Sequence, residues 1–435
     1  MANPNPNEVA IKIKALLEEG QPCFTEECCI YRVPHDIRKH NEEAYTPKVV
    51  SIGPFHHENQ NLLNMEGHKR LYCRQFIERS ETNNLESFVS FVQELEPKVR
   101  GHYSHDIKLS KEEHVMVILV DCCFILQFLL ELVSNDSGGD LLFLTQRLVN
   151  SIRSDLLLVE NQVPFFVLER LYNLAFPSTL TSGTANHTHP LLLLALAILP
   201  DKIINGDHDN VEQTLSNVGR VAHFTDLSRK LLLKSSELFQ PSSASGCSRE
   251  AHVTHLYSAT ELHESGVKFE VNRKSKCLLD MKISGHTLRI PFIIVDDWTE
   301  VLLRNLLAFE QCHCIHESYL VDYIIFFDFL INTDKDVNLL IKKGIIENWL
   351  GDSNAVAKMF NSLGTNLMHP NFNVRYSRIF KKLNAFCAHP YHKKVATLRR
   401  DYCSTPWKTA ASIAGIFLLI LTVIQTVFSI LQVVH

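Results

Sequence analysis

The stretch Ala410–Val434, AASIAGIFLLILTVIQTVFSILQVV, contains 25 consecutive residues without a charged side chain. As a helix it would extend roughly 37 Å, which exceeds the ~30 Å hydrocarbon core of a bilayer. Trp407 precedes it at the depth that interfacial aromatic rings occupy. A core helix of a soluble protein rarely runs this long without a charge, so we expect a transmembrane helix over 410–434. The predicted membrane anchor includes Ala410, Ile416, Leu419, Ile424, Phe428 and Val434.

The segment before this span is basic. Residues 381–409 carry seven Lys or Arg and one Asp, a net charge of +6. The predicted basic membrane flank comprises Lys393, Lys394, Arg399, Arg400 and Lys408. The positive-inside rule places such a flank in the cytosol, where anionic lipids attract it. We therefore expect a single-pass, tail-anchored protein with a cytosolic N-terminal part, in the plasma membrane or the endoplasmic reticulum.

The rest of the chain has the composition of a reduced globular protein. Of 435 residues, 46% are hydrophobic and 21% are charged, and the net charge is −5. The twelve cysteines include two adjacent pairs, Cys28–Cys29 and Cys122–Cys123, which are poorly placed for disulfides. Lys12 and Lys14 interrupt the apolar residues near the start, so no signal peptide is predicted. Outside the basic flank the net charge is about −11, which disfavours nucleic-acid binding.

Apolar periodicity predicts that this acidic part is mainly helical. Helices are expected at Met65–Arg79, Leu85–Val99, Val115–Val133, Leu141–Leu158, Phe165–Ala175, Leu191–Leu199, Thr299–Cys314, Leu320–Ile331 and Val337–Leu350. Strand-like alternation occurs at Val267–Val271, Cys277–Ile283 and Thr287–Val295, with a turn at 284–286. These strands predict a small antiparallel sheet within 267–295.

These patterns divide the chain into successive segments. An amphipathic helix is expected at 1–20 and a large, mainly helical domain at 21–400. A juxtamembrane segment follows at 401–409, and then the span at 410–434. The Ser-rich stretch 241–250 is either a subdomain boundary or a long surface loop.

Common catalytic signatures are missing from the sequence. It contains no G-x-S-x-G elbow, no G-x-x-x-x-G-K phosphate loop, no H-E-x-x-H and no C-x-x-C pair. The low glycine content, 16 residues, also argues against a glycine-rich phosphate cradle. No catalytic residue and no cofactor is predicted from motifs.

One cluster has the chemistry of a metal site. His56, His57, Glu66 and His68 supply nitrogen and oxygen ligands within thirteen residues. Against this, neighbouring His56 and His57 would point apart on a strand. Glu66 and His68 would lie on nearly opposite sides of a helix. The alternative is a rigid loop whose imidazoles bond to the backbone.

Two further clusters allow a functional and a structural interpretation. Cys312, His313, Cys314 and His316 offer at most two metal ligands on one helical face, so a buried helix end is favoured. Asp296, Asp297 and Glu300 contain a carboxylate pair suited to acid–base chemistry. They also have the spacing of a capping box with Asp297 as the N-cap, which is the favoured interpretation.

The polar stretch from Glu160 to Gln162 precedes Pro164. It is interpreted as closing one helix, after which Pro164 allows the next to begin. Phe165 and Phe166 are then expected in the core.

Several segments together resemble a plant-specific family. They are IYRVP (30–34), YTPKVVSIGPFHH (45–57), MEGHK (65–69), LVENQVPFFVLE (158–169), ATEL (259–262), GVKF (266–269), DDWTE (296–300) and RNLLAFEQCH (304–313). The family is known as domain of unknown function 247, or uncharacterised protein family 0481. The resemblance covers roughly the whole chain, including the basic flank and C-terminal span. Cys122 and Gln127, after Asp121, depart from the usual Asp-Gly and Phe-Ile-Leu-Glu pattern.

The resemblance implies one C-terminal transmembrane helix and no established enzymatic activity, and some grass members are linked to self-incompatibility recognition. The leading hypothesis is a non-enzymatic, membrane-anchored recognition or signalling protein. It would contact lipid through its tail and an unknown protein through its head. The alternative is a metal-dependent hydrolase that uses His56, His57, Glu66 and His68.

Overall fold

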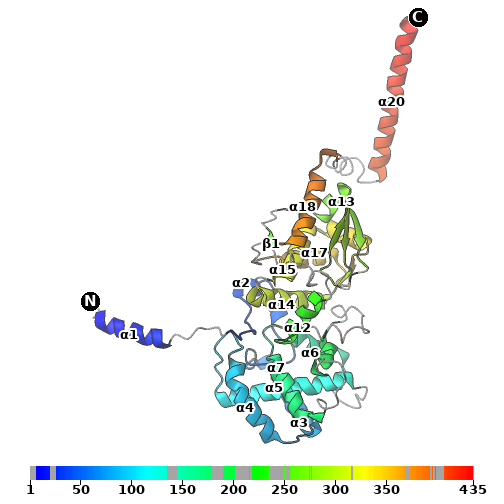
Figure 1. Ribbon diagram of the computed structural model, residues 1–435. Helices are drawn as coiled ribbons and strands as arrows, with labels where there is room; N and C mark the ends of the chain where they lie inside the picture. Colours follow the sequence, from blue (N-terminus) through cyan, green and yellow to red (C-terminus); the bar gives the residue numbers. More distant parts are fainter. Residues whose placement is uncertain are drawn as a thin grey trace. The chain divides into compact units, whose positions relative to one another are not determined.

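The chain forms two compact units, shown in the computed structural model of Figure 1. The structure describes residues 6–19, 26–134, 145–178, 190–200, 215, 218–234, 249–250, 255–273, 275, 277–314, 317–368, 372–391, 394, 397 and 406–434. Unit 1 comprises residues 1–235 and 298–315, and unit 2 comprises 236–297 and 316–435. Of the stretch considered as a boundary, 241–250, only the last two residues are described.

Unit 1 is a helical bundle. Its helices are α1 (Pro6–Glu19), α2 (His35–Arg38), η1 (Glu42–Tyr45), η2 (Gln60–Met65), α3 (Glu66–Arg79), α4 (Leu85–Arg100), α5 (Lys111–Val133), α6 (Gln146–Asp155), α7 (Phe165–Ala175), α9 (Pro190–Ala195), η3 (Leu196–Ile198), α12 (Phe224–Lys234) and most of α14 (Asp297–His313). The apolar helix α5 packs against α3, α4, α7 and α9. Ser110 and Glu113 begin it with a capping box, and every residue from Asp121 to Leu129 is buried.

Unit 2 combines helices with short strands. They are β1 (Arg249–Glu250), α13 (Ala259–Glu264), β2 (Lys268–Val271), β3 (Lys282–Ser284), β4 (Thr287–Ile290), β5 (Ile293–Val295), α15 (Tyr319–Leu330), α16 (Asp334–Lys342), β6 (Ile346–Asn348), α17 (Ser353–Leu363), β7 (Phe372–Asn373), α18 (Val374–Ala388) and α20 (Pro406–Val434). Helix α17 packs against α15 and α16. The buried Asp322 of α15 accepts a hydrogen bond from the backbone N–H of Asn373 at 3.0 Å.

The predicted antiparallel sheet is wrong in its strand order, which makes the observed sheet mixed. Strand β4 lies between β2 and β3, and it pairs with β3 in antiparallel and with β2 in parallel orientation. The turn at Gly285 joins β3 and β4 as predicted, with φ of +58°. Strand β2 runs opposite to β3 but is not its neighbour. The chain between β2 and β4, residues 272–286, includes β3 and is long enough to connect a parallel pair. Strand β5 pairs in parallel with β6 rather than continuing β4.

Most of the predicted helices are confirmed. Helix α7 covers Phe165–Ala175 as predicted, and α3, α4, α5 and α15 differ from the prediction by only a few residues. The predicted helix Val337–Leu350 is wrong after Lys342. There Gly344, with φ of +69°, ends α16, and Ile346–Asn348 becomes strand β6. Short apolar runs of this kind fit either helix or strand periodicity.

Helix α20 contains the long uncharged stretch. By length and composition, both its segment Trp407–Ile430 and helix α5 could cross a membrane. They differ in burial, because 72% of the apolar window of α5 is buried and none of that of α20 is. The large apolar side chains of α20 are accordingly exposed, among them Ile416 at 61% and Phe428 at 64%.

Candidate functional site

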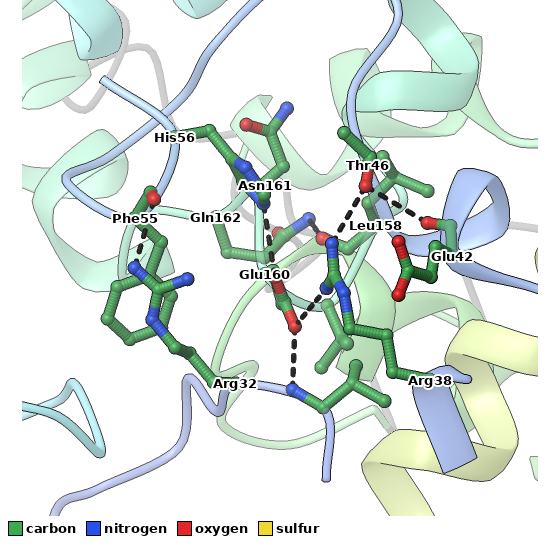
Figure 2. A network of polar contacts seen from close by, with 12 residues as sticks. Arg32, Arg38, Glu42, Thr46, Phe55, His56, Leu158, Glu160, Asn161 and Gln162 are labelled. Carbon is green, nitrogen blue, oxygen red and sulfur yellow. Dashed lines mark hydrogen bonds and ion pairs between the residues drawn. The ribbon is translucent and has the colours of Figure 1, made fainter. Parts of the chain in front are cut away.

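The segment between α6 and α7 contains a buried carboxylate with three partners. Glu160 accepts hydrogen bonds of 2.7 Å from the backbone N–H of Val33 and from Nη1 of Arg38. Its second oxygen lies 3.2 Å from Nε2 of His56, as Figure 2 shows. Burial raises the pKa of Glu160, but the contacts with His56, Val33 and Arg38 outweigh it and hold the pKa below its usual value. Glu160 therefore stays ionised although it is buried.

The side-chain amides of Asn161 and Gln162 form hydrogen bonds with backbone groups of neighbouring segments. The Oδ1 atom of Asn161 accepts from the backbone N–H of Ile52 at 2.7 Å, and its Nδ2 donates to the carbonyls of Val50 and Asp155 at 3.0 Å. Gln162 donates to the carbonyls of Leu156 and Leu158, both at 2.7 Å. Both side chains are buried, so these bonds satisfy backbone groups that water cannot reach.

Asp155, at the end of α6, binds three successive backbone N–H groups. It accepts from Lys48 at 2.9 Å, from Val49 at 2.7 Å and from Val50 at 2.9 Å. Burial raises the pKa of Asp155 to about 6, although the three N–H donors favour the ionised form. The carboxylate is thus used to hold a backbone segment rather than to meet solvent.

A buried ion pair continues the network between α3 and α5. Nζ of Lys69 lies 2.6 Å from Oδ1 of Asp121, and it donates to Glu66 at 2.7 Å and to the carbonyl of Ser51 at 2.9 Å. The second oxygen of Asp121 accepts from the backbone N–H of Gly53 at 2.8 Å. Burial lowers the pKa of Lys69, but the attraction of Asp121 and Glu66 is stronger and raises it. The pair therefore persists as an ammonium and a carboxylate.

Gly53, whose backbone N–H donates to Asp121, lies against the backbone of Gln162, and only glycine fits at this position. Its φ is +71°, and an added Cβ would lie 2.5 Å from the carbonyl oxygen of Gln162. A side chain here would meet both a left-handed backbone and a backbone clash. The segments 45–57 and 158–164 consequently approach each other more closely than a larger residue permits.

Asp155, Glu160, Asn161, Lys69 and Asp121 each contact the segment 46–57, which has no regular secondary structure. We refer to this segment as the anchored loop. Its apolar neighbours Ala44 and Tyr45 pack in a cluster with Val159 and Phe309, and Asn305 of α14 donates to the carbonyl of Ala44 at 2.8 Å. On its exposed side, the guanidinium of Arg32 lies 4.5 Å from the centre of the Phe55 ring and donates to the Phe55 carbonyl.

The residues of the proposed metal cluster do not converge. His56 faces Glu160, and Glu66 is paired with Lys69. His57 and His68 are both half-buried. Among the residues that the structure describes, no three His, Cys, Asp or Glu side chains lie close enough to hold a metal ion. The geometry therefore does not support the hydrolase alternative.

The clusters at 312–316 and 296–300 both contribute contacts within unit 1. His313 of α14 lies 3.0 Å from the hydroxyl of Tyr31, whereas His316 is outside the described residues. Glu300 accepts from Asn41 at 3.0 Å and from Arg304 at 2.8 Å. Helix α14 begins at Asp297 itself, so Asp297 lies within the first turn rather than before it. Thus Glu300 holds neighbouring side chains through two bonds.

Sequence reasoning missed the role of Glu160–Gln162. The helix that they were thought to close ends at Asp155, five residues earlier, while α7 begins directly after Pro164 as predicted. Phe165 is buried and Phe166 only half-buried. Lys69 and Asp121 were also missed as a pair. The available signal was Asp121, a charge inside the apolar run of α5, because buried charges require partners. Helix α3 carries several charges, so the sequence did not single out Lys69 as that partner.

The fold and this network define a class: a mainly helical protein whose sequence motifs fix an irregular loop, followed by a long apolar C-terminal helix. A family model described as a plant protein of unknown function, DUF247, matches residues 30–421. The chain belongs to this family. The match includes the whole polar network and extends into α20.

Two plant relatives match nearly end to end. UPF0481 protein At3g47200 of Arabidopsis thaliana is 30% identical, over 94% of this chain and 87% of the relative. Putative UPF0481 protein At3g02645 of the same plant is 21% identical, over 91% of this chain and 89% of the relative. No solved structure matches the chain.

Proposed function

We propose that this protein is a membrane-anchored, non-enzymatic interaction protein whose helical head is cytosolic. The observation that carries the anchor is the contrast in burial between the two described helices that are long and apolar enough to cross a membrane. None of the apolar segment of α20 is buried, although it is uncharged over 25 residues. So large an exposed apolar surface is unfavourable in water and favourable in a hydrocarbon core. The basic flank supports the cytosolic orientation of the head.

The anchored loop supports an interaction role. Its backbone groups are bonded by buried side chains, while Lys48 is exposed and Phe55 and His57 are half-buried. Loops positioned by a rigid scaffold commonly carry recognition residues. A loop that is already ordered also loses less conformational entropy when it binds. We therefore propose that the exposed side of this loop, with Arg32 stacked on Phe55, contacts a protein partner.

The anchor is tested by fractionating plant cells that express the full chain. We expect it to remain with membranes in alkaline carbonate, and a chain without 410–434 to become soluble. A chain without α1, residues 6–19, is the matched control and should stay with membranes. If the chain without 410–434 still resists carbonate, the proposed anchor is wrong.

The interaction role is tested by proximity labelling with the labelling enzyme at the N-terminus. The wild type is compared with Arg32→Glu, which removes the contacts with Phe55, and with Arg74→Glu, an exposed control on α3. Specific neighbours should be lost with Arg32→Glu and kept with Arg74→Glu. Identical neighbours for all three chains would remove the loop from the proposal. Substrate turnover by the purified chain would overturn the non-enzymatic role.

A further inference from the structure

Helix α18 separates its residues into a buried face and a basic face. Five apolar residues follow the spacing of one helical face, and none of them is more than 5% exposed: Tyr376, Ile379, Phe380, Leu383 and Cys387. Arg378, Lys381 and Lys382 are exposed on the other side, and Arg375 one turn earlier is half-buried. The helix contains no Asp or Glu. We call these four cations the basic face.

The basic face is not neutralised by the protein around it. Arg375, Arg378 and Lys382 form no ion pair with any residue that the structure describes. In the same unit, by contrast, Arg289 of β4 pairs with Glu270 at 3.0 Å. Arg378 lies three residues after Arg375 and four before Lys382, and like charges at these spacings repel each other. Contact with a negatively charged surface would relieve this repulsion.

The chain keeps this face near the proposed membrane anchor. Residues 389–405 connect the end of α18 to Pro406, the first residue of α20. Even fully extended, a connection of this length reaches only roughly 60 Å. It carries four Lys or Arg and one Asp, so an anionic lipid surface attracts the connection as well. A tether of this kind keeps the bilayer surface at a high local concentration, and a weak attraction is then sufficient for binding.

The surroundings of α18 favour lipid over an acidic protein as the partner. Tyr391, three residues after the helix, is 65% exposed, and Trp407 at the start of α20 is 86% exposed. Tyr and Trp rings are enriched at the interface between membrane and water. The chain outside 381–409 is acidic overall, so an anionic leaflet repels most of the head. The basic face is therefore a surface through which the head can approach such a leaflet.

We propose that the basic face of α18 docks on the anionic cytosolic leaflet of the membrane in which α20 is anchored. This inference rests on the proposed anchor and adds a second contact with lipid, made by the folded head. The contact is electrostatic, so it depends on the charge of the lipid and on the salt concentration.

The test uses the full chain in vesicles of phosphatidylcholine alone, or of phosphatidylcholine with added phosphatidylserine. An environment-sensitive fluorescent amino acid replaces Ala385, which is exposed one turn after Lys381 and Lys382. We expect its emission to shift to the blue only in the vesicles with phosphatidylserine. The shift should disappear near ~1 M salt, where the Debye length is about 3 Å. The same amino acid at Met116, an exposed position of unit 1, should not respond.

A pair of substitutions measures the contribution of the basic face. Arg378→Gln combined with Lys382→Gln should lower the ratio of docked to undocked heads about 30-fold, because each cation near an anionic surface contributes about 5-fold. Lys335→Gln combined with Lys358→Gln is the matched control. It removes the same charge from exposed positions of α16 and α17, and should change the ratio less than about two-fold.

Carbonate extraction of the same vesicles distinguishes this proposal from the anchor on which it rests. Release of the wild type would refute the anchor. A wild type that resists carbonate, but whose emission does not respond to phosphatidylserine, would overturn the docking and leave the anchor standing. An equal loss from the control pair, or an equal response at Met116, would also overturn it. If Arg378→Gln with Lys382→Gln removed protein neighbours in cells without any lipid response in vesicles, the basic face would bind an acidic protein instead.

Discussion

Helices α5 and α20 are alike in sequence and opposite in environment. Each is long, strongly apolar and able to span a bilayer by composition, yet only α5 is buried in protein. The difference lies in their charged residues. Helix α5 carries Asp121, which is neutralised by Lys69 of α3 and bonded to the backbone of Gly53. Helix α20 has no charge after Lys408. A charged side chain in an apolar helix needs a partner in the protein, so a helix with one favours the protein interior. An apolar helix without charges can lie in lipid.

The largest expected effect tests the buried side of this comparison. Asp121→Ala would leave the ammonium of Lys69 buried with too few partners, and Gly53 would lose its acceptor. We expect the free energy of unfolding to fall by about 3–5 kcal/mol. Chemical denaturation of the detergent-solubilised chain measures it. Met116→Ala, an exposed control on the same helix, should change stability by under about 0.5 kcal/mol. Equal effects would show that the pair is unimportant.

A buried histidine in the same unit predicts a pH dependence. His223 is fully buried, and burial lowers its pKa to about 4. The unfolded chain, with a pKa near 6.5, therefore takes up the proton first as the pH falls. Between pH 6.5 and 4 the wild type should lose up to about 3 kcal/mol through this group. His223→Gln should flatten that slope, which unfolding curves at each pH would reveal. An unchanged slope would contradict the assignment.

The lipid side of the comparison is tested by adding a charge to each helix. Leu419→Lys places an ammonium near the middle of the span and should disfavour insertion by about 2.5–3.5 kcal/mol. More of that chain should then be released by carbonate. Met116→Lys on α5 should leave membrane retention unchanged. If both substitutions release the chain equally, α20 is not distinguished from α5.

Close packing beneath the anchored loop predicts a smaller effect. Gly53→Ala combines a φ of +71° with a backbone clash and should cost about 1–3 kcal/mol. Gly285→Ala has a similar φ of +58° but open space around it, so it should cost about 1 kcal/mol or less. Thermal unfolding of the two variants compares them directly. A cost at Gly285 as large as at Gly53 would mean that the clash contributes nothing.

The smallest effect concerns a satisfied polar group in the span. The hydroxyl of Thr422 donates to the carbonyl of Leu418 in its own helix, so Thr422→Val should change carbonate resistance less than about two-fold. Carbonate extraction of the two chains side by side measures the difference. A large release of the Thr422→Val chain would show that this hydroxyl has a role beyond its own helix.

Sequence patterns were most informative where the signal is local. The helices at 66–79 and 165–175 follow from apolar periodicity, because one face of each must be buried. The helix at 319–330 follows from an apolar run that is buried on nearly all sides. The pairing of β2 with β4 instead of β3 could not be predicted in this way. Which strands become neighbours depends on how the chain returns in space, and either neighbour satisfies the same alternation.

The polar network shows the same limit. Glu160 and Asn161 are prominent in the sequence, but each has a partner more than a hundred residues away, Val33 and Ile52 respectively. Nothing in the spacing of residues states which distant backbone group a buried amide will reach. The convergence of Lys69 and Asp121 is likewise a product of helix packing between α3 and α5.

By itself, then, the sequence determined the uncharged tail, the basic flank and the family, because these depend on composition and on residue order alone. Only the tertiary structure decided that Lys69 is the partner of Asp121 in α5, that His56 and Glu66 have separate partners, and that the motif residues hold a loop. These outcomes depend on contacts between distant segments, and such contacts form only when burial forces each polar group to find a partner.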